Sequence, residues 1–594
     1  MNYKTPGVYV EEISKLPPSV AQVETAIPVF IGYTDIAEEA DGNTLSGIPT
    51  RIKSMLEYET CFGNAKPQDF MVTLDDNEPY LPQSVDFDGN KTTFLMHPAL
   101  EMFFANGGGT CYIVSVGDYK GNTIGGNPFD DFKTGLDKIR KVDEVTLIVI
   151  PEAEKLGSGD QYNLYAEVMA QCDKLKDRFG IFDVREDDKD GSQLRNDIGT
   201  SFLSYGAAYY PHLKTSINYS YTPKTVTFTH SAADAFDGLT LKNVQTLSSA
   251  LQYQKQLKDA KNRVDSAVSE ADSASRAELI KLFESALSNA KKAVSMAENA
   301  LKLVEDDSYT NTNLGTAQTD LEDVKSFNVG HHNMQQIKNK LNNSNNTPSV
   351  ASLMAEAKSA MDDIVSKINN ETGINNSRNS NISKYFTSQF SSKLLNLLGE
   401  MRMTLPPSST MAGVYATVDA NRGVWKAPAN VSLNRVYGPS VKLTQNENDG
   451  LNVDTTGKSI NAIRSFTGRG TLVWGARTLD GNSKDWKYIS VRRFFIMVEE
   501  SVKKATENFV FEPNSANTWV KVKSMIENFL TIQWRAGALM GAKANDAFYV
   551  KVGLGETMTQ QQINDGKMIV EIGLAAVRPA EFIILRFTHK MLQS

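Results

Sequence analysis

Two groups of residues have types that could bind an anion or a cation, but their spacing argues against both sites. The triple glycine at 107–109 could cradle a phosphate. It follows a helix-forming segment and precedes a strand, however, whereas a phosphate loop opens a helix. We therefore interpret it as a helix stop. Asp187, Asp188 and Asp190 lack the alternating oxygen ligands and distal glutamate of a calcium loop, and are expected to form a solvated turn.

The remaining candidates are a histidine pair and a cysteine. His331 and His332 have no cysteine or carboxylate at metal-ligand spacing, so a solvated pair is expected. Cys172 lies in a predicted amphipathic helix and is expected to be a core residue rather than a nucleophile. No GxxxxGK[ST] segment and no recognisable Ser/His/Asp arrangement occurs. The sequence thus predicts no catalytic, metal-binding or cofactor-binding residues, no cofactor, and a protein that is not an enzyme.

Composition places the chain among ordinary globular proteins. Its 594 residues suggest about three to five domains, with 41% hydrophobic and 22% charged residues. A net charge of −8 argues against a nucleic-acid partner. The three scattered cysteines favour a reducing compartment. Apolar runs such as residues 145–150 are far shorter than the ~20 residues needed to span a bilayer, so membrane insertion is not expected.

The elements that dominate the chain lie in its last hundred residues, 486–594. Apolar residues recur at helical spacing over 491–509, and again over 519–534. The segment at 511–514, FEPN, separates these two predicted helices because proline cannot continue a helix. Strands are predicted at 547–554 and 568–577, with a short capped helix at 559–562 between them.

The final predicted strand, Glu581–Phe587, is apolar on both faces. Ile583, Leu585 and Phe587 occupy one face, while Phe582 and Ile584 occupy the other. Such a strand needs cover on both sides and a partner along its edge. Gly7–Ile13 at the other end of the chain is an isolated strand whose reach is extended by Pro17-Pro18. The open alternative for residues 1–25 is a disordered tail.

Between the two ends the sequence predicts three regions. Residues 26–215 alternate strands and helices, which indicates a layered α/β domain with a partly parallel sheet. Residues 216–402 begin with a hairpin or two short strands and continue as an inserted, mainly helical surface domain, with a coiled-coil seam over 280–304. Residues 403–485 are expected to be loop-rich and β-like, completing the middle domain.

Two loop segments in this last region are unusually rich in large and charged side chains. RGVWKAPAN contains Arg422 and Trp425, and WGARTL contains Arg477. We expect Trp425 to anchor a packed loop, and one of the two arginines to pair with a carboxylate. These three residues are therefore interpreted as structural anchors that serve subunit contacts rather than catalysis.

Taken together, these segments resemble the contractile tail sheath family of myophages, R-type pyocins and related phage-tail-like injection systems. The matching segments keep the family's order along the chain: TPGVYVEEI, FFANGGGTCYIVSV, AAYYP, PPS…NRGVWKAPAN, GRGTLVWGARTL, YISVRRFFIMVEES, FEPN, GALMG and IGLAAVRPAEFIILRF. The insertion at 216–402 has no counterpart in this pattern. The resemblance implies an α/β (α+β) multidomain sheath protein with a tube-facing C-terminal domain at 486–594, and this chain adds the helical insertion to that architecture.

The resemblance also implies a function and partners. Subunits of this family form stacked hexameric rings around an inner tube and contract to drive it through a target envelope. The implied partners are further copies of the chain, the inner tube protein, and baseplate and terminal cap proteins. Assembly in the bacterial cytoplasm would precede incorporation into a phage tail or tail-like particle. The alternatives are a cytoplasmic α/β nucleotide-dependent enzyme, suggested by the strand–helix alternation, and a surface adhesin, which would require a secretion signal.

Two sets of contact residues follow from the family's architecture. Both terminal arms are implied to donate strands to neighbouring subunits. The strand-donating residues are Val8, Tyr9, Val10, Ile13, Phe582, Ile583, Ile584, Leu585 and Phe587. On the helix that begins near Ser515, Lys521, Lys523 and Glu527 lie opposite the apolar face and are expected to face the tube.

Overall fold

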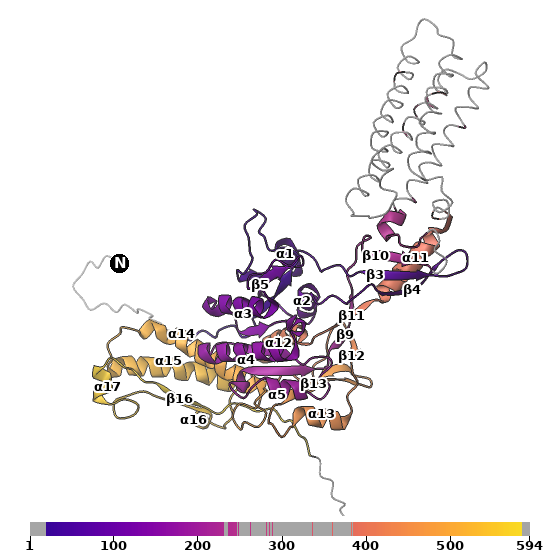
Figure 1. Ribbon diagram of the computed structural model, residues 1–594. Coiled ribbons are helices and arrows are strands. Elements are labelled where there is room, and N and C mark those ends of the chain that lie inside the picture. Colours follow the sequence, from indigo (N-terminus) through magenta and orange to yellow (C-terminus); the bar gives the residue numbers. More distant parts are fainter. Residues whose placement is uncertain are drawn as a thin grey trace, which may run out of the picture. The chain divides into compact units, whose positions relative to one another are not determined.

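The computed structural model describes residues 20–230, 236–245 and 384–584, with isolated residues between 246 and 383. The chain forms two compact units (Figure 1). Unit 1 comprises Met1–Lys66, Thr92–Ile217 and Arg402–Ser594, and unit 2 comprises Pro67–Lys91 and Asn218–Met401. Residues 67–91, expected in the middle domain, therefore belong with the inserted region.

The main sheet of unit 1 has eight strands in the order β14-β13-β8-β7-β6-β1-β5-β2. Strands from β13 to β5 pair in parallel, and the two edge strands pair antiparallel. The strands are β1 (Pro28–Thr34), β2 (Thr50–Ile52), β5 (Cys111–Asp118), β6 (Leu147–Val149), β7 (Phe179–Asp183), β8 (Gly206–Tyr210), β13 (Ile460–Phe466) and β14 (Gly470–Val473). All seven residues of β1 are buried, as expected for a parallel strand covered on both faces.

Helices cover this sheet and confirm the predicted α/β alternation. They are α1 (Met55–Phe62), α2 (Met96–Ala105), α3 (Pro128–Lys138), α4 (Ser158–Leu175), α5 (Ser192–Asp197), α12 (Ser408–Arg422) and α13 (Gln445–Asn452). The triple glycine follows α2, as predicted, with Asn106 as the C-cap and Gly107 at a φ of +93°. Cys172 is buried in α4, and burial raises the pKa of its thiol.

The prediction that residues 403–485 are loop-rich and β-like holds for their strands and irregular stretches but missed two helices. This region contains α12 and α13 besides its strands. Helix α12 escaped detection because it is buried on nearly all sides from Ser408 to Tyr415, so it has no polar stripe to reveal its period. Its N-terminus is fixed by Asp183, which accepts hydrogen bonds from the Ser408 backbone N–H at 2.7 Å and from the Ser408 hydroxyl at 2.5 Å.

A second correction concerns Asp188, which was expected in a solvated turn. Asp188 is buried, and its carboxylate accepts hydrogen bonds from the backbone N–H groups of Gln193 and Leu194 at the start of α5. Asp187 and Asp190 are exposed, as predicted. A buried carboxylate at this place stabilises the helix N-terminus, so the acidic run has a structural role at one of its three positions.

Two small sheets account for the remaining strands before the C-terminal domain. Unit 1 contains β11-β9-β12, formed by β9 (Leu213–Asn218), β11 (Arg402–Leu405) and β12 (Val436–Pro439). Unit 2 contains β10-β3-β4, formed by β3 (Phe70–Leu74), β4 (Pro82–Phe87) and β10 (Val226–Thr229), together with α11 (Ser388–Glu400). Residues 216–230 thus form two strands of different sheets rather than a hairpin. The predicted coiled-coil seam over 280–304, and His331 and His332, lie largely or wholly outside the described residues.

The C-terminal domain consists of two long helices and a small sheet. Its elements are α14 (Ile489–Thr506), η4 (Glu507–Phe509), α15 (Ala516–Arg535), α16 (Ala544–Ala547), β15 (Phe548–Lys551), α17 (Gln560–Asn564) and β16 (Glu571–Leu574). The two predicted helices, the predicted capping box at Thr559 and both predicted strands are confirmed, although the strands are shorter than expected. The last predicted strand is not formed in its described part, because residues 581–584 are irregular.

Candidate subunit-contact site

Helices α14 and α15 pack side by side and form the floor of the candidate site (Figure 1). Phe494, Val498 and Val502 of α14 are buried against Ile526 and Phe529 of α15. The predicted apolar stripes therefore face each other, since residues three and four apart lie on one side of a helix. The loop anchor Trp425 packs on this layer, with its ring 6.4 Å from that of Phe494 and nearly perpendicular to it.

One face of the small sheet lies across this helical floor. Strands β15 and β16 pair antiparallel, with Phe548 opposite Leu574 and Lys551 opposite Glu571. Because side chains alternate along an extended chain, every second residue from 568 to 574 points the same way. Met568, Val570, Ile572 and Leu574 are all partly buried against the helical core. In the described part of the chain this sheet has two strands, so each strand has one edge without a partner strand.

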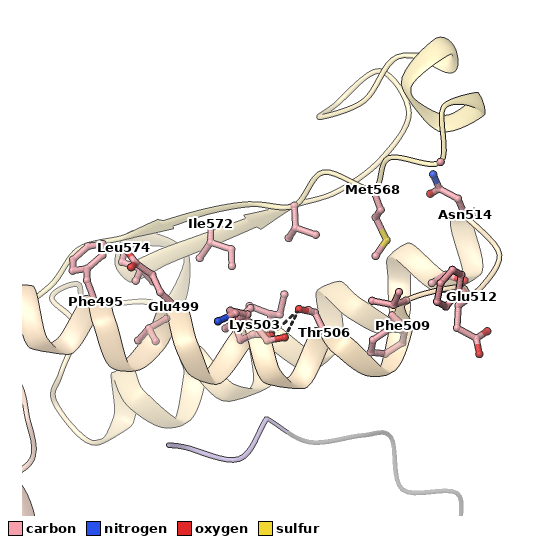
Figure 2. Close-up of a pocket in the computed structure, with 18 residues that line it drawn as sticks. Phe495, Glu499, Lys503, Thr506, Phe509, Glu512, Asn514, Met568, Ile572 and Leu574 are labelled. Atoms are coloured by element: carbon pink, nitrogen blue, oxygen red, sulfur yellow. Dashed lines mark hydrogen bonds between the residues drawn. The ribbon is translucent and has the colours of Figure 1, made fainter. Parts of the chain in front are cut away.

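Between α14 and the segment 568–574 lies an open apolar groove with a volume of about 1010 Å³. Figure 2 shows Phe495 and Leu574 at one end of this groove and Glu512 and Asn514 at the other. On the helical side the groove is lined by Phe495, Val498, Val502, Thr506 and Phe509. These residues span a rise of about 21 Å along the helix. An extended chain of six or seven residues has about this length, at roughly 3.3 Å per residue.

The N-terminal segment lies on the opposite face of the helical layer. The backbone N–H of Val23 donates to the Ser501 hydroxyl at 3.1 Å, and Gln22 accepts a hydrogen bond from Gln533 at 3.1 Å. Ser501 is not among the groove residues of α14, and it points away from them around the helix. The described chain therefore begins at Val20 on the face of the layer away from the groove.

A buried ion pair fixes this segment to the rest of unit 1. Arg493 donates to both carboxylate oxygens of Asp419, at 3.0 and 2.6 Å, and their side chains are 4% and 7% exposed. Asp419 also accepts from the Thr25 hydroxyl at 2.6 Å, while Arg493 donates to the Thr25 carbonyl at 2.8 Å. This pair holds α14, α12 and the root of the N-terminal arm together.

A second ion pair holds the root of the C-terminal arm. Arg477 donates to both carboxylate oxygens of Glu581, at 2.8 and 2.7 Å. Glu581 also accepts hydrogen bonds from Asn452 and from the Tyr488 hydroxyl. Burial disfavours its ionised form, but the hydrogen bonds and charge of Arg477, with Asn452 and Tyr488, outweigh that effect and lower the pKa of Glu581. Immediately after it, Phe582, Ile583 and Ile584 are 71%, 80% and 77% exposed.

The sequence-predicted site residues separate into those that the structure brings together and those that it does not. Arg477 and Trp425 both contact the C-terminal domain, whereas Arg422 is exposed at the end of α12. Lys521 is exposed on α15, but Lys523 and Glu527 are half-buried at its flank, so they are not fully opposite the buried face as expected. Val8, Tyr9, Val10, Ile13, Leu585 and Phe587 lie outside the described residues.

Glu581, Arg493 and Asp419 were missed by sequence reasoning. Glu581 joins Arg477 across 104 positions, and Arg493 joins Asp419 across 74. The available signal was indirect: Glu581 is a charged residue directly before a strongly apolar strand, at the end of the Arg578-Pro579 interruption. The local sequence pattern shows that this charge is unusual, but it does not indicate that Arg477 is its partner.

We predict that Glu581→Gln will lower the free energy of unfolding by about 1.5–3 kcal/mol, because a charge-assisted pair to a buried arginine is lost. The folded-state pKa of Glu581 is lowered, so its stabilisation is complete above the unfolded pKa of about 4.3 and disappears as pH falls through the lower folded value. Urea unfolding of both proteins at pH 7 and pH 3 measures this. Glu571→Gln, which removes an exposed carboxylate, is the control. An equal difference at both pH values would contradict the prediction.

In a doubly wound fold a nucleotide binds where neighbouring strands connect in opposite directions, which in the main sheet is between β1 and β6. The side chain of Glu152 fills this position. Glu152 is buried, and its carboxylate accepts backbone hydrogen bonds from Leu95 and Met96 at the start of α2, and from Tyr33. Burial raises its pKa to about 7 against these donors and Lys155. The N–H groups that a phosphate would need are therefore already used.

The described residues contain no group of three or more His, Cys, Asp or Glu side chains placed to hold a metal ion. Across the same part of the chain, none of the helices combines the length and apolar character needed to cross a membrane.

Comparison with known proteins gives consistent results. Residues 482–590 match the phage tail sheath C-terminal domain family. The tail sheath protein of Vibrio phage KVP40 is 27% identical over 130 residues, which are 21% of this chain and 19% of that protein. A putative prophage major tail sheath protein of Pseudomonas aeruginosa is 25% identical over 177 residues, which are 30% and 44% of the two chains. These matches thus cover less than half of either relative's length.

Solved structures extend the likeness to nearly the whole chain. The helical sheath of the anti-feeding prophage in its contracted state is 26% identical, with a TM-score of 0.52, and covers 99% of this chain and 100% of that one. A chain in the baseplate structure of the same particle is 26% identical, with a TM-score of 0.51 and the same coverage. The sheath complex of an extracellular contractile injection system, 24% identical with a TM-score of 0.50, shares the fold. Together, the family match at residues 482–590, the two tail sheath relatives and the likeness along nearly the whole chain show that this protein is similar to contractile tail sheath proteins.

Proposed function

We propose that this structural subunit polymerises as hexameric rings stacked around an inner tube, and that contraction of the sheath drives the tube through a target envelope. The observation that carries the proposal is the open apolar groove beside a two-stranded sheet, in a chain whose C-terminal arm exposes three apolar residues in succession. A single chain thus has both an unfilled acceptor and an unburied donor, which is the arrangement that strand exchange between copies requires.

In this assembly the terminal arms of one copy add strands to the C-terminal domains of others. The donor residues are Val8, Tyr9, Val10 and Ile13 in the N-terminal arm, and Phe582, Ile583, Ile584, Leu585 and Phe587 in the C-terminal arm. Backbone hydrogen bonds to the sheet edge would give affinity, and alternate side chains in the groove would give register. The Arg477–Glu581 and Arg493–Asp419 pairs would fix where each arm leaves its own subunit.

The further partners follow from the same architecture. They are the inner tube protein, baseplate proteins and a terminal cap, with no nucleic acid and no membrane insertion. The structural likeness to a chain in the anti-feeding prophage baseplate supports the association with a baseplate. We place assembly in the bacterial cytoplasm and the mature protein in a phage tail or tail-like particle. The energy for contraction would come from packing between subunits, so the proposal assigns no catalytic role.

Electron microscopy of the purified full-length chain tests this function directly. Sheath-like tubes or rings are expected at high protein concentration, with and without the inner tube protein. A chain that remains monomeric at all concentrations and does not co-assemble with tube protein would contradict the proposal.

The tube contact is proposed to lie on the exposed side of α15, centred on Lys521 and extended by Lys523 and Glu527. Lys521 is exposed together with Ser524 and Asn528, whereas the other two charged residues border the buried face. A tube that is released during contraction suits weak contacts, because an exposed ion pair contributes only ~0–1 kcal/mol and repetition along the tube supplies the register.

We predict that Lys521→Glu combined with Lys523→Glu will greatly reduce extended particles assembled around tube, while contracted sheath still forms alone. The cause is reversal of the charge presented to the tube, repeated at every subunit. Particle counts by electron microscopy measure the effect. Lys484→Glu with Lys543→Glu makes the same charge change at exposed positions of the domain that do not line the groove. Normal yields of extended particles from the α15 variant would exclude this face as the tube contact.

A further inference from the structure

The tip between α14 and α15, residues 510–514, holds an exposed aromatic side chain on an unfavourable backbone conformation. Phe511 has a φ of +68°, in the left-handed region that residues with a Cβ seldom adopt. Phe511 is fully exposed, and Val510 beside it is 62% exposed. A bulky residue that is both strained and unburied gains nothing from its own fold, which points to a contact outside the single chain.

The exposure of this tip does not arise from a loose loop. The hydroxyl of Thr518 donates to the Pro513 carbonyl at 2.7 Å, and the indole N–H of Trp519 donates to Asn514 at 2.7 Å. Asn514 in turn donates to the Lys567 carbonyl at 3.0 Å. The tip is thus tied to α15 on one side and to the chain leading into β16 on the other, so it is held in place before any partner binds.

The tip stands at one end of the apolar groove. Val510 and Phe511 both line this groove, next to Phe509 and Glu512. Glu512 marks that end of the groove in Figure 2. A strand that lies along α14 would therefore place one face against the groove. At the end near Glu512, its other face would lie within reach of Val510 and Phe511.

The C-terminal arm of a second copy meets these requirements. Among the described residues, Phe582, Ile583 and Ile584 form the longest run of strongly exposed apolar side chains, at 71–80% exposed. Apart from Arg586, the segment 582–587 is apolar on both faces, so a groove covers one face and leaves the other in need of cover. Gly7–Ile13 has glutamates at 11 and 12 and needs less apolar cover. The arm is exposed in the single chain although the groove is open, which favours an arm from another copy.

We propose that Val510 and Phe511 form a preformed latch that covers the outer face of the C-terminal arm of a neighbouring copy once residues 582–587 occupy the groove. This inference rests on the proposed strand donation, and it adds the residues that hold the donated strand in place. Burial of a phenylalanine ring at the end of the strand slows its release, since aromatic anchors contribute most where water is excluded.

The first test locates the latch's partner. Phe511 is replaced by the photoreactive analogue p-benzoylphenylalanine in the full chain, and sheath is assembled from a mixture of isotopically heavy and light protein. After irradiation, cross-linked peptides are identified by mass spectrometry. The proposal expects heavy–light cross-links from position 511 to residues 580–588. Cross-links confined to other regions, to the tube protein, or to the arm of the same chain would overturn it.

The second test separates the latch from a purely structural role. Phe511→Asn keeps a residue that tolerates positive φ but removes the ring. Because the ring is fully exposed, the urea midpoint of the monomer is expected to stay the same or rise. The concentration needed for sheath assembly is expected to increase at least tenfold. Phe202→Asn is a matched control, because Phe202 also has a positive φ of 59° and is 44% exposed, but does not line the groove.

The possible results distinguish the latch from the function on which it rests. Assembly of Phe511→Asn at the wild-type concentration would overturn the latch and leave strand donation intact. An equal loss of assembly in Phe202→Asn would also overturn it, because the effect would not be specific to the groove. A wild-type chain that forms no sheath would overturn the proposed function itself.

Discussion

Removal of residues 1–19 is expected to leave a folded, soluble monomer that forms no sheath. The deletion ends before Val20, which packs against the C-terminal helical core, so the Val23–Ser501 and Arg493–Asp419 contacts remain. What is lost is the predicted strand Gly7–Ile13 and with it one donated strand per subunit. We expect the free energy of unfolding to change by less than about 0.5 kcal/mol, and assembly to fall below detection.

Two variants of the full chain sharpen this prediction. Val8→Asp with Val10→Asp places charges on the face of the strand that would enter an acceptor domain, and is expected to block assembly as the deletion does. Glu11→Gln with Glu12→Gln changes two neighbouring residues without adding charge, and is expected to assemble normally. Electron microscopy and sedimentation measure both outcomes. Normal sheath from the truncated chain would show that strand donation from this end is wrong.

The parts of the fold that follow local periodicity were predictable from the sequence. The sequences of α14 and α15 each have an apolar side and a polar side, and the structure forms both helices where this pattern predicts them. The alternation of strands and helices predicted the parallel sheet for the same reason. In contrast, α12 is buried on nearly every side, so its sequence of small residues has no contrast between faces.

Features that depend on distant pairing were not predictable. Strand β3 pairs with β10, more than 150 positions later, which moves residues 67–91 into unit 2. The contacts of the candidate site show the same limit. The sequence marked Arg477 and the apolar arm as unusual, but their connection through Glu581 depends on two segments that meet only in the folded chain. The groove likewise required both α14 and the strand at 568–574 to be in place.

The second prediction concerns the groove itself: Val570→Asp is expected to abolish sheath assembly while the monomer stays folded. Val570 lines the groove and is only partly buried in the single chain, so water can still reach a carboxylate there. Once a donated strand covers the groove, that carboxylate loses its contact with water and gains no hydrogen-bond donor or positive charge in return. Burial of an unpaired polar group costs several kcal/mol, and this cost recurs at every subunit.

The adjacent residue provides the control, since side chains alternate along an extended chain. Ile569 does not line the groove and is 38% exposed, so Ile569→Asp introduces the same charge on the other face of the same segment. We expect Ile569→Asp to form sheath, and both variants to remain folded as judged by urea unfolding. Sheath formation by Val570→Asp would mean that the donated strands bind elsewhere. If neither variant forms sheath, the face that carries Ile569 would also be a subunit contact. Alternate side chains of this segment point to opposite faces, so each variant tests one face.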